Sequence, residues 1–162
     1  MKVRRASDGR AYLLQLCLQR GYSARVPEPF RHRIRVRFNE CDGQGVVFYA
    51  NYLVYFDLAM TERRAAFSDG YAGMIENGTD AMVAEANIRY RASARFDDEV
   101  ELVATVTRIG TTSTVTRLRA ERATDGETLA EADLRHVFID PATLEKTEIP
   151  EEVRTGMERY AE

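Results

Sequence analysis

The sequence predicts an α+β fold in which one long helix lies against an antiparallel sheet. Three features carry this prediction: a strictly alternating segment at 30–38, a helical pattern at 50–68, and four long alternating segments after residue 80. Strands that follow one another through short turns pair antiparallel, and an amphipathic helix needs another layer to cover its apolar face. With 162 residues, the chain can form one domain that buries roughly two-thirds of its unfolded surface.

Residues 1–29 are predicted to be a flexible extension, which leaves 30–162 as the folded domain. The extension is basic, contains one short apolar run, and ends near two prolines that interrupt any helix. Gln15 and Gln19 break up the apolar run, which disfavours a secretory signal peptide. A disordered tail or an upstream start codon is the favoured interpretation, and an organellar transit peptide is the alternative.

The segment 30–38 is predicted to be a half-buried strand, because its polarity alternates with a period of two. Its apolar face is expected to hold Phe30, Ile34, Val36 and Phe38. The other face carries four arginines, which are expected to meet solvent.

Residues 50–68 are predicted to form a helix of about five turns, because apolar side chains recur at three- and four-residue steps. Asp69 and Gly70 end this helix, and a short helix is expected at 72–76. The buried stripe is expected to contain Tyr52, Tyr55, Phe56, Ala59, Met60, Arg63, Ala66 and Phe67.

Four more strands complete the predicted sheet. Their alternating polarity places them at 81–91, 98–109, 112–122 and 127–140. Turn residues separate the later strands, and Asp125-Gly126 is the strongest hairpin signal. A short terminal helix is expected after Pro150.

The composition argues against several classes of protein. Residues 1–38 hold ten of the 23 Lys and Arg and two of the 26 Asp and Glu, which leaves 13 basic and 24 acidic residues in 39–162. An acidic body argues against a nucleic-acid partner, and no apolar run approaches the ~18 residues of a membrane span. Cys17 and Cys41 make no disulfide framework, so a cytoplasmic location is expected. No spacing of His and Cys suits a metal site, and none is expected.

The candidate site is the segment 39–51, NECDGQGVVFYAN. It places one acid, Asp42, in a turn ahead of a glycine and of the predicted helix start. Free N–H groups at a helix N-terminus can hold an oxyanion, and a carboxylate can attack a carbonyl or activate water. The segment therefore suits chemistry on an electrophilic carbonyl. The competing interpretation is that Asp42 only caps a turn or a helix.

The same segment carries the pattern D-x-x-G-x-V-x-Y-x-N-Y, which begins at Asp42 and ends at Tyr52. Segments 90–102 and 129–140, with a glycine turn between them, follow in matching order and spacing. Over about residues 31–150 the chain resembles the hot-dog fold thioesterases of the 4-hydroxybenzoyl-CoA thioesterase class, which include the broader acyl-CoA thioesterases of bacteria.

The resemblance implies a hot-dog fold, in which a five- to six-stranded antiparallel sheet wraps a long central helix. It also implies an enzyme that hydrolyses an acyl-CoA thioester to a free carboxylic acid and CoA. No cofactor is implied, because the CoA is part of the substrate. Members of the family pair their subunits edge to edge with the active sites at the interface, so a homodimer or homotetramer is expected, with no nucleic-acid or membrane partner.

The resemblance also implies roles for individual residues, according to their positions in the shared pattern. Asp42 matches the catalytic aspartate, as nucleophile or general base, and the backbone N–H of Tyr49 matches an oxyanion-hole donor. Some members have histidine where Tyr49 stands, so no imidazole is expected to act there. Contacts to the substrate are expected from the neighbouring loop residues Gly45, Val47, Phe48, Ala50, Asn51 and Tyr52.

Two other functions stay open. One is hydrolysis of an acyl chain held on an acyl carrier protein, although the related enediyne polyketide proteins lack the aspartate. The other is a non-catalytic acyl-CoA-binding protein. A hydratase is disfavoured because no histidine closely follows Asp42. The sequence does not identify the acyl group, because the helix residues could line a pocket for either an aromatic or an aliphatic chain.

Other reactive side chains are assigned structural roles. Cys41 is expected to be a small buried residue and Glu62 a solvated one. Some related folds use a helix glutamate in catalysis, so Glu62 is the second choice for the catalytic acid. His32 is placed on the arginine face of the first strand, and His136 is expected to be solvent-facing or a hydrogen-bonded core residue. The three acids at 97–99 are expected to serve a turn.

Three arginines lie just before that turn, at Arg89, Arg91 and Arg95. The favoured interpretation is that they pair with nearby acids on a solvated face. The alternative is that they contact the phosphates of CoA.

Overall fold

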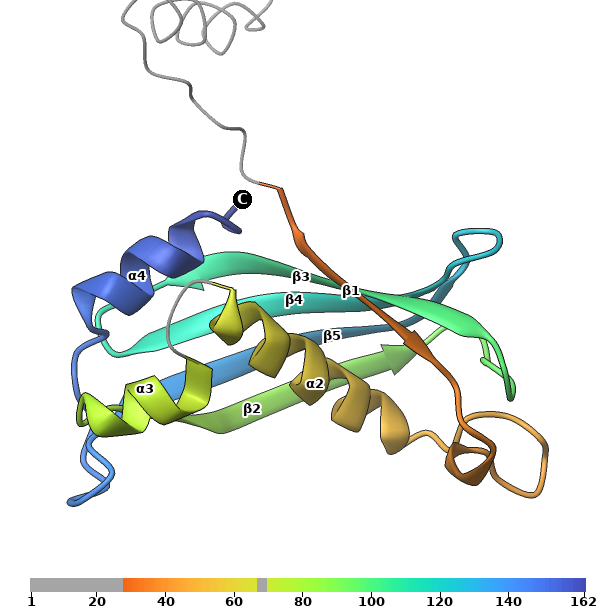
Figure 1. Cartoon of the computed structure of the whole chain (residues 1–162), viewed down its shortest axis with the longest axis horizontal. Helices are drawn as coiled ribbons and strands as arrows, with labels where there is room; N and C mark the ends of the chain where they lie inside the picture. Colours follow the sequence, from red (N-terminus) through yellow and green to blue (C-terminus); the bar gives the residue numbers. More distant parts are fainter. Residues whose placement is uncertain (1–27, 67–69) are drawn as a thin grey trace, which may run out of the picture.

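The computed structural model describes residues 28–66 and 70–162, so almost all of the predicted extension 1–29 lies outside the described residues. A five-stranded antiparallel sheet has the strand order β1-β3-β4-β5-β2. The long helix α2 lies along one face of this curved sheet (Figure 1). The elements are β1 (Phe30–Arg35), the 3-10 turn η1 (Phe38–Glu40), α2 (Asn51–Ala65), α3 (Gly70–Glu76), β2 (Asp80–Tyr90), β3 (Glu99–Ile109), β4 (Ser113–Arg122), β5 (Thr128–Ile139) and α4 (Glu151–Glu158). The predicted fold class and the order of its elements are confirmed.

The first strand is shorter than predicted. It ends at Arg35, and the chain then turns through η1, where the Cys41 N–H donates to the Phe38 carbonyl at 3.2 Å. Phe38 therefore does not face the core: it is 78% exposed, and its ring contacts Phe96 edge-on with centroids 5.8 Å apart. The prediction for Phe38 was wrong because the turn into the candidate loop interrupts the alternation.

The helix α2 supplies the main core contacts through a stripe spaced at three and four residues. Its buried residues are Tyr52, Tyr55, Phe56, Ala59, Met60 and Arg63. These side chains pack against the inward face of the sheet, where residues such as Leu102, Leu118 and Leu129 are fully buried. The predicted stripe is confirmed up to Arg63, whereas Ala66 is exposed and Phe67 lies outside the described residues. The position of the stripe fixes the start of α2 above one end of the sheet.

The opposite face of the sheet is covered by ion pairs. Arg35 contacts Glu99 at 2.7 Å, Arg117 contacts Asp133 at 3.4 Å, and Arg31 pairs with Glu101. The arginines of β1 therefore meet acids of β3 and the β2–β3 turn, as expected for a solvated face. Each exposed pair contributes little stability by itself, so the interior side of the sheet carries the packing energy.

The strand β2 forms one edge of the sheet and pairs only with β5 among the described strands. It is eleven residues long and mostly exposed, and its apolar residues Met82 and Val83 are open to solvent. A long free edge with apolar side chains is a surface to which another strand can add. Within the described ranges, no helix is long and apolar enough to cross a membrane.

Candidate active site

Asp42 lies in a tight turn between η1 and α2. Its N–H donates to the Val46 carbonyl at 2.9 Å, and its carbonyl accepts from the Gly45 N–H at 2.9 Å. Gly45 has a φ of 72°, a left-handed conformation that a side chain would strain. One carboxylate oxygen, Oδ1, accepts from the Gln44 N–H at 2.8 Å, and no described residue donates to Oδ2. The turn therefore holds the carboxylate in place and leaves one of its oxygens available.

Glu40 fastens this turn to the start of α2. Its carbonyl accepts from the Phe48 N–H at 2.9 Å and from the Asn51 side-chain amide at 2.8 Å. Its carboxylate accepts from the Arg37 N–H at 2.7 Å and from the Tyr55 hydroxyl at 2.9 Å. Burial and the neighbouring Glu40 raise the pKa of Tyr55, so the hydroxyl keeps its proton and remains a donor.

The start of α2 leaves two backbone donors without an acceptor. The N–H groups of Asn51, Tyr52 and Leu53 donate to carbonyls three residues earlier, at 2.9, 3.4 and 3.1 Å. The N–H groups of Tyr49 and Ala50 have no hydrogen-bond acceptor among the described residues. They are the donors in this loop that a ligand oxygen could use.

A cluster of aromatic rings connects the loop to the end of β2. The Tyr90 hydroxyl donates to the Tyr49 carbonyl at 3.1 Å, and the two rings contact edge-on. Tyr90 also contacts Tyr52, whose hydroxyl accepts from the Ala94 N–H at 3.1 Å. These contacts position the peptide unit that follows Tyr49 and anchor the beginning of α2.

The residues expected to contact substrate divide into two groups. Gly45, Phe48 and Tyr49 are exposed, and Ala50 and Asn51 are partly buried. Val47 and Tyr52 are buried in the core, so their side chains support the loop from below. Sequence reasoning did not assign Glu40, Tyr55 or Tyr90 to the site. Their polar contacts join residues eleven to 41 positions apart, which no local pattern reveals.

A family model described as "Thioesterase superfamily" matches residues 44–129, which is more than half of the chain. The chain belongs to the thioesterase superfamily. The match begins two residues after Asp42 and contains the remainder of the loop and all of α2. The predicted family is therefore confirmed, and with it the assignment of the sheet and central helix to the hot-dog fold.

Individual relatives of this thioesterase-superfamily chain agree with that assignment. It is 27% identical to the acyl-CoA thioester hydrolase YbgC of Escherichia coli O6:H1 over 124 residues, which cover 76% of this chain and 92% of that protein. A crystal structure of a hypothetical protein from Aquifex aeolicus superposes with a TM-score of 0.75 and 25% identity, covering 80% of this chain and 99% of that one. A 1,4-dihydroxy-2-naphthoyl-CoA thioesterase from Synechocystis has the same fold, with a TM-score of 0.74, 22% identity, and coverage of 80% and 95%.

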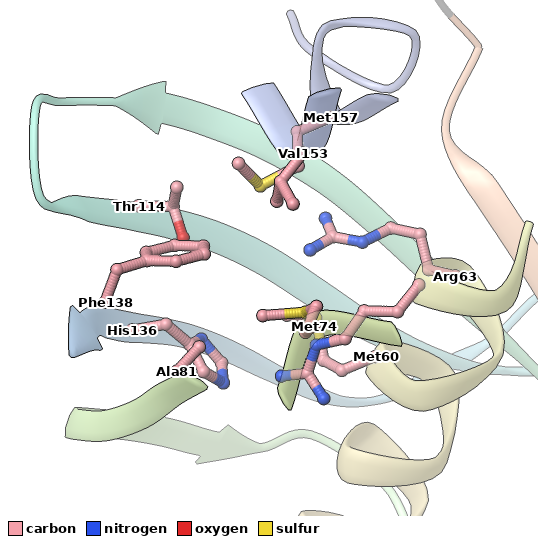
Figure 2. A pocket seen from close by; sticks show the side chains of 10 residues that line it. Met60, Arg63, Met74, Ala81, Thr114, His136, Phe138, Val153 and Met157 are labelled. Carbon is pink, nitrogen blue, oxygen red and sulfur yellow. The ribbon is translucent and has the colours of Figure 1, made fainter. Parts of the chain in front are cut away.

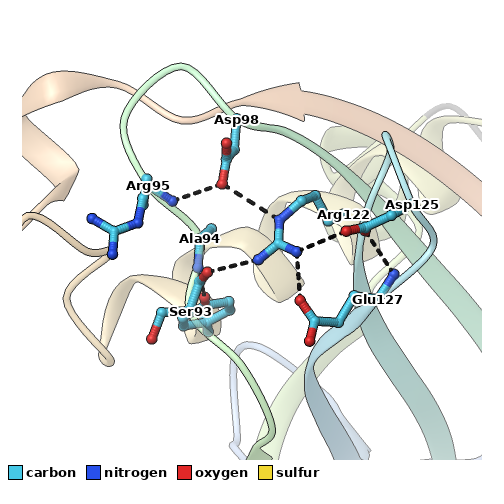
Figure 3. A network of polar contacts seen from close by, with 8 residues as sticks. Ser93, Ala94, Arg95, Asp98, Arg122, Asp125 and Glu127 are labelled. Carbon is cyan, nitrogen blue, oxygen red and sulfur yellow. Dashed lines mark hydrogen bonds and ion pairs between the residues drawn. The ribbon is translucent and has the colours of Figure 1, made fainter.

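In this superfamily member, the segment 93–98 lies beside the loop and is hydrogen-bonded to it. The Ala94 carbonyl accepts from the Val47 N–H at 2.9 Å. Arg122 donates to the Ser93 carbonyl at 3.0 Å and pairs with Asp98 at 3.7 Å, as Figure 3 shows. The predicted turn role of Asp98 is confirmed, because its carboxylate also accepts from the Arg95 N–H at 2.8 Å. Arg122 thus stabilises the loop indirectly, through Ser93 and Ala94.

Other candidate residues lie as follows. Cys41 is partly buried beside the turn, where its backbone bridges to Val47. Glu62 is exposed on α2, as predicted. His32 was misplaced: it alternates with the arginines and lies on the side of Phe30 and Ile34, where it is partly buried. Of the three arginines before the turn, Arg91 pairs with Glu131 at 3.2 Å.

The Tyr55–Glu40 hydrogen bond gives a testable prediction. We expect Tyr55→Phe to lower the free energy of unfolding by about 1–3 kcal/mol, because a partly buried carboxylate loses a donor. Urea denaturation measures this loss. The matched control is Tyr71→Phe, since the Tyr71 hydroxyl donates to Asp80 at 3.0 Å from an exposed position. Equal losses in the two variants would show that burial of the Glu40 contact is unimportant.

His136 is buried in β5 and has no partner at Nδ1 among the described residues, so the predicted hydrogen-bonded core role is wrong for that atom. Burial, with the positive charges of Arg64 and Arg63, lowers the pKa of His136 from 6.5 to about 4. Between pH 6.5 and about pH 4, His136 binds a proton in the unfolded chain but not in the folded chain. The free energy of unfolding therefore falls as the pH falls through this interval.

We expect this loss to reach about 3 kcal/mol near pH 4 relative to neutral pH. Chemical denaturation of wild type and His136→Leu at pH 7, 6, 5 and 4 isolates the effect, because leucine does not titrate. The variant should lose less stability than wild type over this interval. Parallel pH profiles would contradict the assignment.

Proposed function

We propose that this chain hydrolyses acyl-CoA thioesters to a free carboxylic acid and CoA. One observation carries the proposal: a single loop holds the Asp42 carboxylate together with the N–H groups of Tyr49 and Ala50, and among the described residues one carboxylate oxygen and both N–H groups have no hydrogen-bond partner. Superfamily membership and similarity to a protein named as an acyl-CoA thioester hydrolase support the same reaction.

The proposed chemistry divides between the two parts of the loop. The N–H groups of Tyr49 and Ala50 donate to the thioester oxygen as it gains negative charge, and a donor of this kind typically lowers the barrier by ~3 kcal/mol. Asp42 either attacks the carbonyl, expels CoA as a thiolate and forms a mixed anhydride that water opens, or removes a proton from the attacking water. Both routes release a carboxylic acid and CoA and need no further cofactor.

Substrate contacts are proposed for the open part of the loop. Gly45 lets the backbone approach the thioester without a side chain, and Phe48 and Tyr49 offer exposed aromatic surface. Ala50 carries one of the two available N–H donors, and Asn51 follows it at the helix start. Val47 and Tyr52 shape the loop from within the core.

A second subunit is proposed to complete the site. In one chain the Asp42 turn is open to solvent, because Gly43, Gln44 and Gly45 are all exposed. The free edge of β2 ends at Tyr90, which holds the Tyr49 carbonyl. Pairing of two β2 edges would therefore bring a partner beside the loop and restrict water there. A homodimer, alone or as half of a tetramer, is the proposed assembly, with 30–162 as the thioesterase domain.

A thiol-release assay over short, long and aromatic acyl-CoAs tests the proposed function. We expect turnover of at least one class, with the same acyl group on a carrier protein as the comparison substrate. Faster turnover of the carrier-bound chain would assign the activity to that substrate instead. Tight acyl-CoA binding without thiol release would overturn hydrolysis and favour a binding protein.

A further inference from the structure

Tyr90 donates a side-chain hydrogen bond to a backbone carbonyl of the candidate site. Its hydroxyl lies 3.1 Å from the carbonyl oxygen of Tyr49. That carbonyl belongs to the same peptide unit as the N–H of Ala50, which has no acceptor among the described residues. A peptide unit is planar and this one is trans, so its N–H points away from its carbonyl. The contact with Tyr90 therefore fixes the direction of the Ala50 N–H.

The backbone around Tyr90 is anchored to the sheet. Tyr90 is the last residue of β2 and pairs with Ala130 of β5. The next two N–H groups, of Arg91 and Ala92, both donate to the Leu129 carbonyl, at 2.8 and 3.1 Å. Partial burial raises the pKa of Tyr90, so its hydroxyl keeps the proton that it donates. The end of β2 thus presents a donor in a defined position to the loop.

The helix α2 is held in place by contacts other than the Tyr90 hydroxyl. At its start, the Asn51 side-chain amide donates to the Glu40 carbonyl at 2.8 Å. At its other end, Arg63 is buried among side chains of α3, α4 and the sheet (Figure 2) and donates to the Thr116 hydroxyl at 3.3 Å. Loss of the Tyr90 hydroxyl should therefore affect one peptide unit and leave the helix where it is.

We propose that Tyr90 is a positioning residue for thioester hydrolysis, which orients and polarises the N–H of Ala50 as an oxyanion donor. The inference rests on the proposed function. A hydrogen bond accepted by a carbonyl polarises its peptide unit and strengthens the N–H of that unit as a donor. The N–H of Tyr49 belongs to the preceding peptide unit, so the contact favours Ala50 over Tyr49 as the stronger donor.

The conformation of Ala50 supports the same role. Its φ of −67° and ψ of −26° are helical, which aligns its N–H with the axis of α2 at the positive end of the helix dipole. Negative charge on the thioester oxygen develops toward the transition state, so a stronger donor there accelerates the chemical step more than it tightens substrate binding. The contribution of Tyr90 is therefore expected in kcat and not in KM.

Tyr90→Phe tests the proposal, because it removes the hydroxyl and keeps the ring that contacts Tyr49 with centroids 6.3 Å apart. For an acyl-CoA that the wild type hydrolyses, we expect kcat to fall about 3- to 10-fold, the range for one neutral hydrogen bond, with KM unchanged. The matched control is Tyr71→Phe. Tyr71 has similar exposure and its hydroxyl donates to Asp80 at 3.0 Å, outside the proposed site, so both constants should stay at wild-type values.

The NMR chemical shift of the Ala50 amide nitrogen provides a readout without substrate, since it responds to hydrogen bonding at the preceding carbonyl. We expect this nitrogen to move upfield in Tyr90→Phe and to stay in place in Tyr71→Phe. Wild-type kcat in Tyr90→Phe, an effect confined to KM, or an unchanged Ala50 shift would overturn the inference while the proposed function stands. Absence of thiol release by the wild type would overturn the proposed function, and this inference with it.

Discussion

Asp42→Asn is expected to lower kcat for acyl-CoA hydrolysis by about 10²- to 10⁴-fold, the range for losing a positioned acid–base group. Asparagine keeps an oxygen that can accept the Gln44 N–H, now at 2.8 Å from Oδ1, so the turn should persist. It can neither attack the thioester carbonyl nor take a proton from water. The assay is thiol release under saturating substrate, with circular dichroism to verify the fold.

The matched control for this substitution is Asp140→Asn. Asp140 also accepts a backbone N–H two residues later, from Ala142 at 2.7 Å, but it lies after β5 and outside the proposed site. If the only role of Asp42 were to stabilise its turn, both variants would remain active. Full activity of Asp42→Asn would therefore reject the carboxylate mechanism, whereas loss in that variant alone supports it.

Phe56→Ala is expected to lower the free energy of unfolding by about 3–5 kcal/mol, the usual cost of truncating a fully buried phenylalanine. Phe56 is 0% exposed and lies in the middle of the α2 stripe against the sheet. Its removal leaves a cavity between the two layers, because neighbouring side chains can only partly relax into the space. Urea denaturation at neutral pH gives the difference.

Val54→Ala provides the comparison on the same helix. Val54 is 63% exposed, so its truncation should change stability by less than about 0.5 kcal/mol. Both substitutions favour helix formation, and the contrast between them therefore measures packing. Similar stability of Phe56→Ala and Val54→Ala would mean that α2 does not pack on the sheet as described.

The sequence predicted best where one local pattern controls the structure. The three- and four-residue spacing from Tyr52 to Arg63 located α2 to within a few residues, and Asp125-Gly126 marked the β4–β5 hairpin. The pattern was less informative where the chain leaves a regular element. Phe38 continues the alternation of β1 in sequence, but the backbone bonds of η1 turn it outward.

Within the candidate site, the sequence indicated the acid and the helix start but not the parts that hold them. Glu40 and Tyr55 meet only when α2 lies beside η1, and Tyr90 contributes only when the end of β2 lies beside the loop. Arg63 shows the same limit. Its place in the apolar stripe was evident from spacing, whereas its hydrogen bond to the Thr116 hydroxyl depends on β4.

The ion pairs on the outer sheet face restrict how subunits can stack. Arg35 with Glu99, Arg117 with Asp133 and Arg91 with Glu131 each keep much of their hydration in the single chain. Pressing two such faces together would remove that water from many charges at once, and the desolvation would offset the gain from contact. A tetramer of this protein would lose less hydration energy by joining its dimers through their helical sides, leaving the charged faces of the sheets on the outside.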